Sequence, residues 1–411
     1  MANMNLTTAD KVLKVFYLPP LQHLLNNQTI LWNRLERNEN FNVEGKSFTV
    51  PLHVSRHTQA GAGRAEEGTL PSKDAQGYNQ AIVPAKYIYT RIQVSGQVMR
   101  ATRSDAGAFI RALRSEIEGA TRDTKRSSNR QAHGDGTDAL AYYVSGSGGT
   151  APVADDNLGN PFVHVGSKAT TVDLIDTGDN STKHDDSVTI LDTGTEVATG
   201  TTLTASANVS GSAADGDYWV LEDTLGNQMT GLDGIVRTGD PPLLGSGLHG
   251  ITASGKAYWQ SQIVGDDTAF ADLRFANMQR VISKMAQASD YDKDDIEFGL
   301  ASYFMVDKYY ELAANERRAI NVMQLDGGYE GVEFSGIPLV ADQQCKHNRI
   351  YFINPQALRI CRMADFNWMD MDGAVLSRVA DKDAYEATLY HYGDLACTAR
   401  NALGALVGQN E

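Results

Sequence analysis

Cysteine is scarce in this chain of 411 residues, and Cys345, Cys361 and Cys397 all lie in its last sixth. Because the cysteines are few and odd in number, the sequence argues against a disulfide framework and favours synthesis in a reducing cytoplasm. Long hydrophobic runs are also missing, because no stretch approaches the roughly 18 apolar residues that a membrane span requires. The first residues have no apolar segment followed by a small-residue cleavage site, so we expect no secretory signal and no membrane partner.

Positive charge is the second shortage. The chain has 36 Lys and Arg against 51 Asp and Glu, a net charge of −15, whereas proteins that grip nucleic-acid backbones normally carry the opposite sign. The deficit is uneven, because residues 1–140 carry a net +5 and residues 141–250 a net −12. We interpret the change near residue 140 as a boundary between two regions of different composition.

Catalytic motifs are missing too, since the sequence contains no GxSxG, HExxH or CxxC. Residues 245–250 match GxGxxG, but two prolines precede them and no helical pattern follows, so a flexible turn is the better interpretation. Residues 250–257 resemble a Walker A loop, yet Ala257 stands where a Mg²⁺-binding hydroxyl is needed. We therefore predict no catalytic and no cofactor-binding residues.

No pattern of metal ligands is convincing. The acidic cluster at 290–297 has Asp295 and Ala301 where a calcium loop needs Gly and Glu, which favours a solvated turn between a helix and a strand. The cysteines and His347 lack the paired short spacings of a structural zinc site. We predict no bound metal.

Two segments have the alternation of half-buried strands. In 46–56 the apolar residues share one parity and polar residues the other, and the same holds for 86–100. The stretch between them is polar and contains glycine, so we predict a hairpin with a very long loop. A two-stranded ribbon is marginal in water by itself, and we expect it to lie on a surface outside its own subunit.

A long amphipathic helix is predicted next. Ser104 is a suitable N-cap, and apolar residues then recur at spacings of three and four until the sequence HGDG stops the helix after about Ala132. Before the ribbon, residues 1–45 have only short apolar patches and an early Pro19-Pro20, which predicts an arm without a core of its own.

The remaining sequence divides into two parts. Residues 145–235 are rich in Gly, Ser, Thr and Asp, with short β-branched runs between turn signals, and predict a small all-β unit. From Asp266 onward we predict a helix over about 270–285, a strand at IEFGLA, a helix capped near Ser302, and several further strands to the C-terminus.

This order of segments resembles the major capsid protein of tailed bacteriophages, the Hong Kong 97-like family. EGKSFTVPLH, EEGTLP and VPAKYIYTRIQVSGQV resemble its extended loop (E-loop), and SDAGAFIRALRSEIEGATRDTKRSSNRQAHGDG its spine helix. FADLRFANMQRVISKMAQ, IEFGLASYFMVDKYYELAAN and VEFSGIPLVAD resemble the axial domain, and YEATLYHYGDLACTARNAL resembles the strand returning toward the spine helix.

The resemblance implies an α+β fold of the Hong Kong 97-like type with an inserted all-β domain. The expected parts are an N-terminal arm (1–45), an E-loop hairpin (46–100), a spine helix and peripheral domain (101–144), a β-rich insertion (145–240), an axial domain (241–384) and a returning C-terminal strand (385–411).

By the same resemblance, the chain assembles with itself as pentamers and hexamers into an icosahedral head that encloses double-stranded DNA without sequence specificity. The implied partners are a separate scaffolding protein, a portal and a decoration protein on the β-rich insertion. The resemblance also implies assembly in the host cytoplasm and a final place in the virion. Two alternatives stay open, an encapsulin-like compartment shell and, from another class, a β-rich surface adhesin or hydrolase.

The candidate functional residues are contacts between subunits at the tip of the E-loop. The tip is rich in glycine and carries charges of both signs: Arg64, Glu66, Glu67, Lys73 and Asp74. We expect this loop to become ordered against a neighbouring subunit, with Arg64 and the two glutamates in ion pairs across that boundary. In the type member of the family that this chain resembles, a lysine of the E-loop is joined covalently to an asparagine of a neighbouring subunit. No spacing in this sequence singles out such a pair, so we expect subunits without covalent cross-links.

Overall fold

The computed structural model describes residues 29–37, 41–42, 47–97, 106–143, 150–153, 170–192, 196–197, 200–205, 213–214, 216–245, 247–266, 271–315, 322–325, 329–370 and 375–409. Most of the predicted arm and the proposed cap at Ser104 lie outside these ranges. Within the described part of the chain, no helix is long and apolar enough to cross a bilayer.

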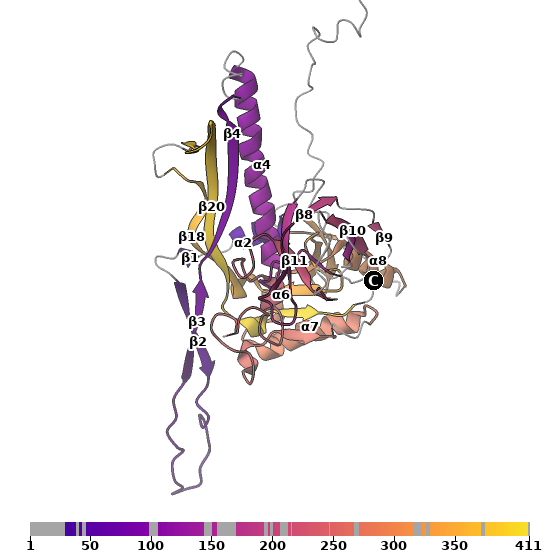
Figure 1. The fold of residues 1–411 in the computed structure, drawn as a ribbon. Coiled ribbons are helices and arrows are strands. Elements are labelled where there is room, and N and C mark those ends of the chain that lie inside the picture. The colour runs from indigo at the N-terminus through magenta and orange to yellow at the C-terminus, as the bar shows by residue number, and fades with distance from the viewer. Residues whose placement is uncertain are drawn as a thin grey trace, which may run out of the picture.

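The longest element is helix α4, Ala106–His133, and it ends where the HGDG signal predicts. It runs alongside strand β4, Lys86–Ser95 (Figure 1). The Thr124 hydroxyl on α4 donates a hydrogen bond to the Thr90 hydroxyl on β4 over 2.6 Å. The predicted amphipathic helix is thus confirmed, and its inner face covers one side of a sheet.

That sheet joins strands from opposite ends of the sequence. Its strands are β1 (Phe41–Asn42), β18 (Leu358–Trp368), β20 (Ala384–Cys397), β19 (Ser377–Arg378) and β4. β20 pairs antiparallel with β4 on one side and with β18 on the other. On β4, Ile88 is buried toward α4 while Tyr87 and Tyr89 are exposed, so the predicted alternation is confirmed.

The predicted pairing of the hairpin is wrong. β2, Ser47–Ser55, pairs with β3, Gly77–Pro84, whereas β4 pairs with β20. β3 was missed because its polar half, Gly77 to Gln80, hides the alternation. Pro84, which cannot donate to a ladder, ends β3, and the chain then enters a different sheet.

The base of the β2–β3 ribbon has support within its own subunit, contrary to expectation. Ala81 and Val83 are buried, and Val50 and Leu52 pack against the main core. The amide of Ile82 also donates a hydrogen bond to the carbonyl of His249 over 2.8 Å. Only the far part of the ribbon and its loop extend beyond the body (Figure 1).

Part of the predicted arm also belongs to the core. Helix α2, Ile30–Arg37, buries Leu31, Trp32 and Leu35. The Trp32 ring lies edge-on to the rings of His391 and Phe366, with centroids 5.6 and 5.9 Å apart. The prediction failed because the apolar cluster is too short to signal burial, which comes from contacts with α4, β18 and β20.

A second sheet has the strand order β12 (Gln262–Val264), β21 (Gly404–Leu406), β17 (Ile350–Ile353), β13 (Phe298–Ala301), β16 (Ile337–Ala341), β15 (Tyr329–Phe334) and β14 (Val322–Leu325). Helix α7, Phe275–Ala288, lies so close to β21 that a Cβ at Gly404 would come within 2.6 Å of the Met285 sulfur. Helix α8, Tyr303–Asn315, has the predicted cap, since the Met305 amide donates to the Ser302 hydroxyl (3.2 Å).

A third sheet contains β5 (Ala141–Tyr142), β6 (Thr150–Val153), β7 (Thr170–Ile175), β8 (Lys183–Asp192), β9 (Glu196–Val197), β10 (Gly200–Ala205) and β11 (Tyr218–Leu221). The strands predicted in this region are confirmed. The sheet has small apolar clusters of its own, but Met229, Leu232 and Ile235 belong to the main core. The last part of the predicted insertion therefore packs with the main core and not with this sheet.

The shorter helices are α6 (Leu232–Ile235) and the 3₁₀ turns Ala257–Trp259, Lys293–Asp295, Pro355–Ala357 and Arg400–Ala402. The GxGxxG segment is a tight turn, as predicted: Gly247 has φ +78°, and a Cβ there would lie 2.3 Å from the carbonyl oxygen of Ile251. The acidic segment is the predicted exposed turn, in which the Asp292 amide donates to Asp295 Oδ2 over 2.8 Å.

Candidate subunit interface

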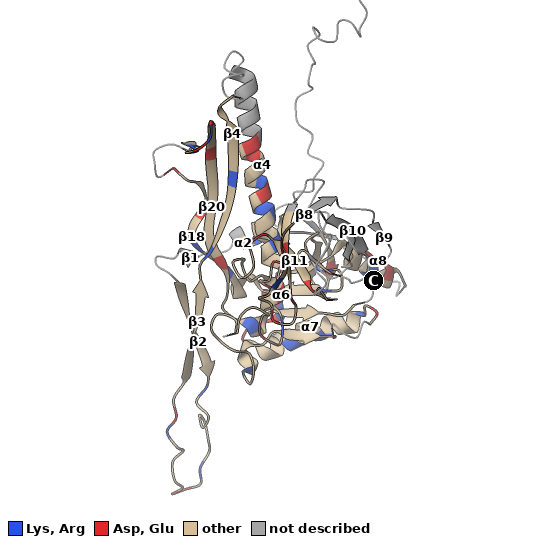
Figure 2. Ribbon diagram, viewed as in Figure 1, with Lys and Arg blue, Asp and Glu red and all other residues tan. Residues whose placement is uncertain are grey.

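All five predicted contact residues lie in the loop of residues 56–76, which joins β2 to β3 and is exposed almost throughout. Figure 2 shows charges of both signs spread along this loop. We call it the tip loop. Its geometry divides the five residues into one that holds the loop together and four that face solvent.

Asp74 is the residue that closes the tip loop. Its Oδ2 accepts hydrogen bonds from the amide (2.9 Å) and the hydroxyl of Thr58, and its Oδ1 accepts one from the Ala75 amide (2.8 Å). These bonds lower the pKa of Asp74 to about 2, and the bond from the Thr58 hydroxyl contributes most. The structure thus brings Asp74 to Thr58, and its first role is to shape the loop.

Arg64, Glu66, Glu67 and Lys73 form no ion pairs within the described part of the subunit. Arg64 Nη2 lies 3.4 Å from Gln59 Oε1, which also accepts a hydrogen bond from the Ser72 amide. The pairing of Arg64 with the glutamates across a subunit boundary stays a prediction. The charges themselves are accessible for such contacts.

Exposed apolar side chains on the ribbon were not foreseen. Leu70 in the tip loop is 82% exposed and Tyr78 on β3 is 73% exposed. Ile82 lies on the same open face, opposite Thr49 of β2. These side chains are available to a neighbouring surface, but the sequence could not reveal them because β3 was not recognised as a strand.

Four tyrosines make a second surface, on the side of the β4–β20 pair that faces away from α4; Tyr87 and Tyr89 are exposed, and the other two are half-buried. Tyr87 lies opposite Tyr392, and Tyr89 lies opposite Tyr390. The Tyr87 and Tyr392 rings are 5.0 Å apart, and the Tyr89 hydroxyl donates to the Tyr392 hydroxyl (3.2 Å). This bond is the main reason that the pKa of Tyr392 is raised to about 12. We call this surface the tyrosine face.

Behind these surfaces, buried charges join the parts of the fold. Asp233 on α6 is fully buried, and its carboxylate accepts hydrogen bonds from Lys346 Nζ (2.9 Å), Arg349 Nη1 and the Tyr351 hydroxyl (3.3 Å). Burial opposes the ionisation of Asp233, but Lys346, Arg349 and Arg237 outweigh it and hold its pKa far below the usual range. The carboxylate therefore ties α6 to the segment before β17.

A second buried carboxylate, Asp342, ties α2 and α4 to the end of β16. Its Oδ2 lies 3.1 Å from His133 Nε2 and 3.4 Å from both Asn129 Nδ2 and the Leu31 amide. Burial again opposes ionisation, and His133 is the largest of the contributions that lower the pKa. We call the surroundings of Asp233 and Asp342 the junction.

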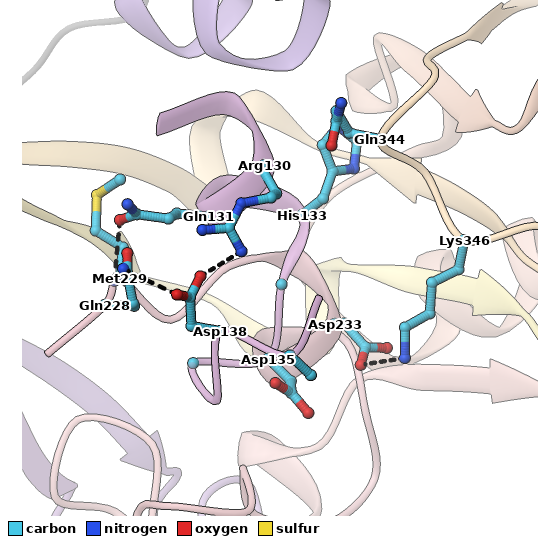
Figure 3. A pocket seen from close by; sticks show the side chains of 13 residues that line it. Arg130, Gln131, His133, Asp135, Asp138, Gln228, Met229, Asp233, Gln344 and Lys346 are labelled. Carbon is cyan, nitrogen blue, oxygen red and sulfur yellow. Dashed lines mark hydrogen bonds and ion pairs between the residues drawn. The ribbon is translucent and has the colours of Figure 1, made fainter. Parts of the chain in front are cut away.

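The junction encloses a cavity of about 40 Å³, lined in part by Arg130, His133, Asp138 and Gln228 (Figure 3). Arg130 forms an ion pair with Asp138 at its wall. Substrate pockets usually measure roughly 300–1,000 Å³, whereas a cavity of this size accommodates ordered water. The contacts in the junction thus connect helices and strands of the fold, and we interpret them as structural.

Among the described residues, one group of acidic side chains has oxygens close enough together to hold a metal ion: Asp173, Asp186 and Asp223. The Nζ atom of Lys183 lies 2.9, 2.8 and 3.0 Å from the three carboxylates. These contacts raise the pKa of Lys183, and the hydrogen bond to Asp186 contributes most. An ammonium group therefore already occupies the centre of the cluster.

No known protein family's profile and no curated protein sequence matches this chain. Solved structures do. A chain of the cyanophage A-1(L) capsid asymmetric unit aligns with a TM-score of 0.63 at 14% identity, covering 99% of this chain and 100% of that chain. The fold is therefore an α+β fold shared with a phage capsid.

Two further structures align at lower scores. One is from Mycobacterium phage Bobi, with a TM-score of 0.49, 12% identity and full coverage of both chains. The other is the holo-SrpI encapsulin complex from Synechococcus elongatus, with a TM-score of 0.48, 8% identity and coverage of 100% of this chain and 97% of that chain. At these scores neither structure adds to the argument, and neither separates a phage head from an encapsulin shell.

Proposed function

We propose that this chain is the major capsid protein of a tailed bacteriophage, which assembles with itself as pentamers and hexamers into an icosahedral head around double-stranded DNA. The observation that carries the proposal is the likeness to the cyanophage capsid over the whole length of both chains. The exposed ribbon supports it, because a projecting two-stranded element with apolar side chains needs a neighbour.

The parts of such a subunit can be assigned on this basis. The ribbon of β2, β3 and the tip loop is the E-loop, and α4 with the β4–β20–β18 sheet is the peripheral domain. The second sheet with α7 and α8 is the axial domain. The sheet from β5 to β11 is the insertion, on which a decoration protein would bind.

The remaining partners follow from the same proposal. A separate scaffolding protein and a portal complete the assembly, which takes place in the host cytoplasm. A net charge of −15 suits a wall that holds DNA without gripping its phosphates. Catalysis plays no part in this function.

Expression of the full chain with and without its scaffolding protein tests the proposal. We expect closed particles or capsomers in electron micrographs and in sedimentation. A folded 44.6 kDa monomer under every condition would contradict it. Particles that enclose a protein cargo and no genomic DNA would favour the encapsulin alternative instead.

A replacement tests whether the insertion is separable. The Thr224 hydroxyl donates to Asp138 Oδ2 over 2.7 Å, so the two ends of the insertion lie side by side. Residues 139–223 can therefore be replaced by a short Gly-Ser linker at little cost in loop-closure entropy. We expect a folded subunit that still assembles, and the loss of all soluble protein would show that the sheet is part of the core.

A further inference from the structure

His391 on β20 is a buried histidine with an unsatisfied ring. The residue is 0% exposed, and neither Nδ1 nor Nε2 has a hydrogen-bond partner within the part of the chain that the structure describes. His249 is buried as well, but its Nε2 accepts a hydrogen bond from the Cys397 amide over 3.1 Å. Because most buried polar groups in proteins are hydrogen-bonded, the ring of His391 calls for an explanation.

Aromatic and apolar groups enclose the His391 ring. Phe366 of β18 stacks on it, with ring centroids 4.4 Å apart and an interplanar angle of 18°. Trp32 of α2 lies edge-on to it at 5.6 Å, and Ile88 of β4 lies opposite His391 in the ladder. A Cβ at Gly393 would lie 3.1 Å from Nε2, so this side of the ring is closely packed as well. The neutral ring fits these surroundings, whereas a charged ring would be costly there.

No described carboxylate of β18 or α4 contacts the His391 ring. Asp365 of β18 pairs with Arg362 over 3.2 Å, and the ammonium group of Lys125 on α4 lies 5.9 Å from the centroid of the Phe366 ring. Burial is the main reason that the pKa of His391 falls to about 4, while Asp365 acts in the opposite direction and Arg362 in the same one. A proton on the ring is thus disfavoured as long as the ring stays enclosed.

Other charged groups on the elements around His391 are engaged elsewhere. Arg34 of α2 pairs with Glu297, and Lys86 of β4 donates to the carbonyl of Gly226 over 2.6 Å. Asp394, three residues further along β20, is buried. It is present in every variant compared below, so its own titration cancels in the comparison.

Helix α2 closes this site from one side, and two contacts anchor the helix there. The first is the contact of the Trp32 ring with His391. The second is the Leu31 amide, which donates to Asp342 Oδ2 over 3.4 Å, and Asp342 in turn contacts His133. Although burial opposes its ionisation, the pKa of Asp342 lies below its ordinary value because of His133, so this carboxylate stays ionised above pH 5. A change in α2 between pH 5 and pH 7.5 is therefore not expected from Asp342.

We propose that His391 makes the docking of α2 acid-sensitive, because protonation of its ring loosens the contact of Trp32 with β18 and β20. When α2 opens, the ring meets water, and its pKa returns from about 4 in the docked form toward the ordinary value of 6.5. The docking is therefore at full strength above about pH 7 and weakens as the pH falls from 6.5 to 4. At pH 5 the equilibrium is shifted about 30-fold toward the open form. The inference goes beyond the proposed function and does not rest on it, since a single subunit contains the whole device.

Hydrogen exchange of the full chain at pH 7.5 and pH 5.0 tests the inference. Protection factors of residues 30–37, which are corrected for the intrinsic effect of pH on exchange, report how often α2 opens. We expect them to fall about 30-fold in the wild type between the two pH values. In His391→Phe they should fall less than about threefold, because phenylalanine keeps a ring between Trp32 and Phe366 but takes up no proton.

Two controls separate this site from other effects of acid. His53→Phe, on the ribbon, removes a different histidine and should leave the response of residues 30–37 as in the wild type. The amides of α7, which packs on β12 and β21, should lose less than about threefold in protection in the wild type. His391→Met, which also takes up no proton, is expected to behave like His391→Phe and serves if the larger ring does not fit.

Three results would overturn the inference. Protection of α2 that is the same at both pH values in the wild type would show that His391 takes up no proton when the helix opens. An equal loss in the wild type and in the His391 variants would assign the response to another group, such as His133. An equal loss in α2 and α7 would mean that acid loosens the whole subunit. The capsid proposal is tested by assembly and stands or falls separately from these results.

Discussion

The tip loop and the junction carry similar charges in opposite settings. In the tip loop, Arg64, Glu66 and Lys73 are exposed and form no ion pair within the described part of the subunit. In the junction, Asp233 is fully buried and contacts several cations at once. An exposed ion pair is worth about 0–1 kcal/mol, whereas removing one partner of a buried pair costs about 3–5 kcal/mol.

Buried and exposed charges therefore have different roles in one subunit: the first stabilise the fold, and the second are available to a neighbouring subunit. Charges that hold the fold are buried and already paired, so they have nothing left to offer a neighbour. Charges that are free to meet a neighbour contribute little to the stability of the subunit alone. Each variant below changes one side of this contrast and should leave the other side unchanged.

The largest effect is expected from Asp233→Ala. This change leaves the buried Arg349 and the half-buried Lys346 without their carboxylate, and we expect the free energy of unfolding to fall by about 3–5 kcal/mol. Denaturant unfolding measures it. Asp294→Ala, at an exposed position, is the control and should change stability by less than about 0.5 kcal/mol. Equal effects of the two variants would remove the distinction between junction and surface.

Deletion of residues 61–73 should weaken assembly and leave the stability of the isolated subunit almost unchanged. Most of these residues are exposed, so the melting temperature of the isolated subunit should move by no more than about 2 °C. Assembly should fall to a small fraction of the wild-type yield, because the tip loop and Leu70 are lost. Light scattering and calorimetry of the same preparation give both values. Normal assembly of this variant would mean that the tip loop makes no essential contact.

Asp394 on β20 adds a third case to the comparison, because it is buried and forms no ion pair with any residue that the structure describes. Burial raises its pKa to about 7, against weaker opposing effects of the Leu395 amide and Lys86. The folded state then keeps a proton that the unfolded state releases above about pH 4. Stability should therefore fall as the pH rises from 4 to 7 and level off above 7.

Asp394→Asn should remove this dependence. We expect the wild type to lose on the order of 3 kcal/mol more than the variant between pH 5 and pH 8. Unfolding curves at the two pH values measure it, with Asp365→Asn at an exposed position as the control. Parallel pH profiles of wild type and Asp394→Asn would show that the carboxyl is ionised throughout.

The smallest effect is expected from Arg64→Glu. One exposed charge reversal should leave the unfolding free energy within about 0.5 kcal/mol and weaken assembly several-fold, more so at low salt. Assembly yields at two salt concentrations test this. Lys382→Glu, an exposed reversal outside the ribbon, is the matched control. If both reversals have the same effect, net charge and not a contact at Arg64 is responsible.

The candidate contact residues illustrate how far sequence reasoning reaches. It placed Arg64, Glu66, Glu67, Lys73 and Asp74 in one exposed loop, and all five lie there. It did not foresee that Asp74 closes the loop through Thr58, because that bond joins residues 16 positions apart. Tyr78 and the tyrosine face were missed because their exposure depends on which strands pair.

The sequence by itself determined the elements whose signals are local. The helix Ala106–His133, the alternation of β4 and the Ser302 cap all follow from spacing and chemistry within a few residues. Only the tertiary structure decided that β2 pairs with β3 while β4 pairs with a strand about 300 residues away. It also decided that α2 is core and that Asp233 meets Arg349. Such choices depend on burial against distant segments, and a local pattern is compatible with more than one partner.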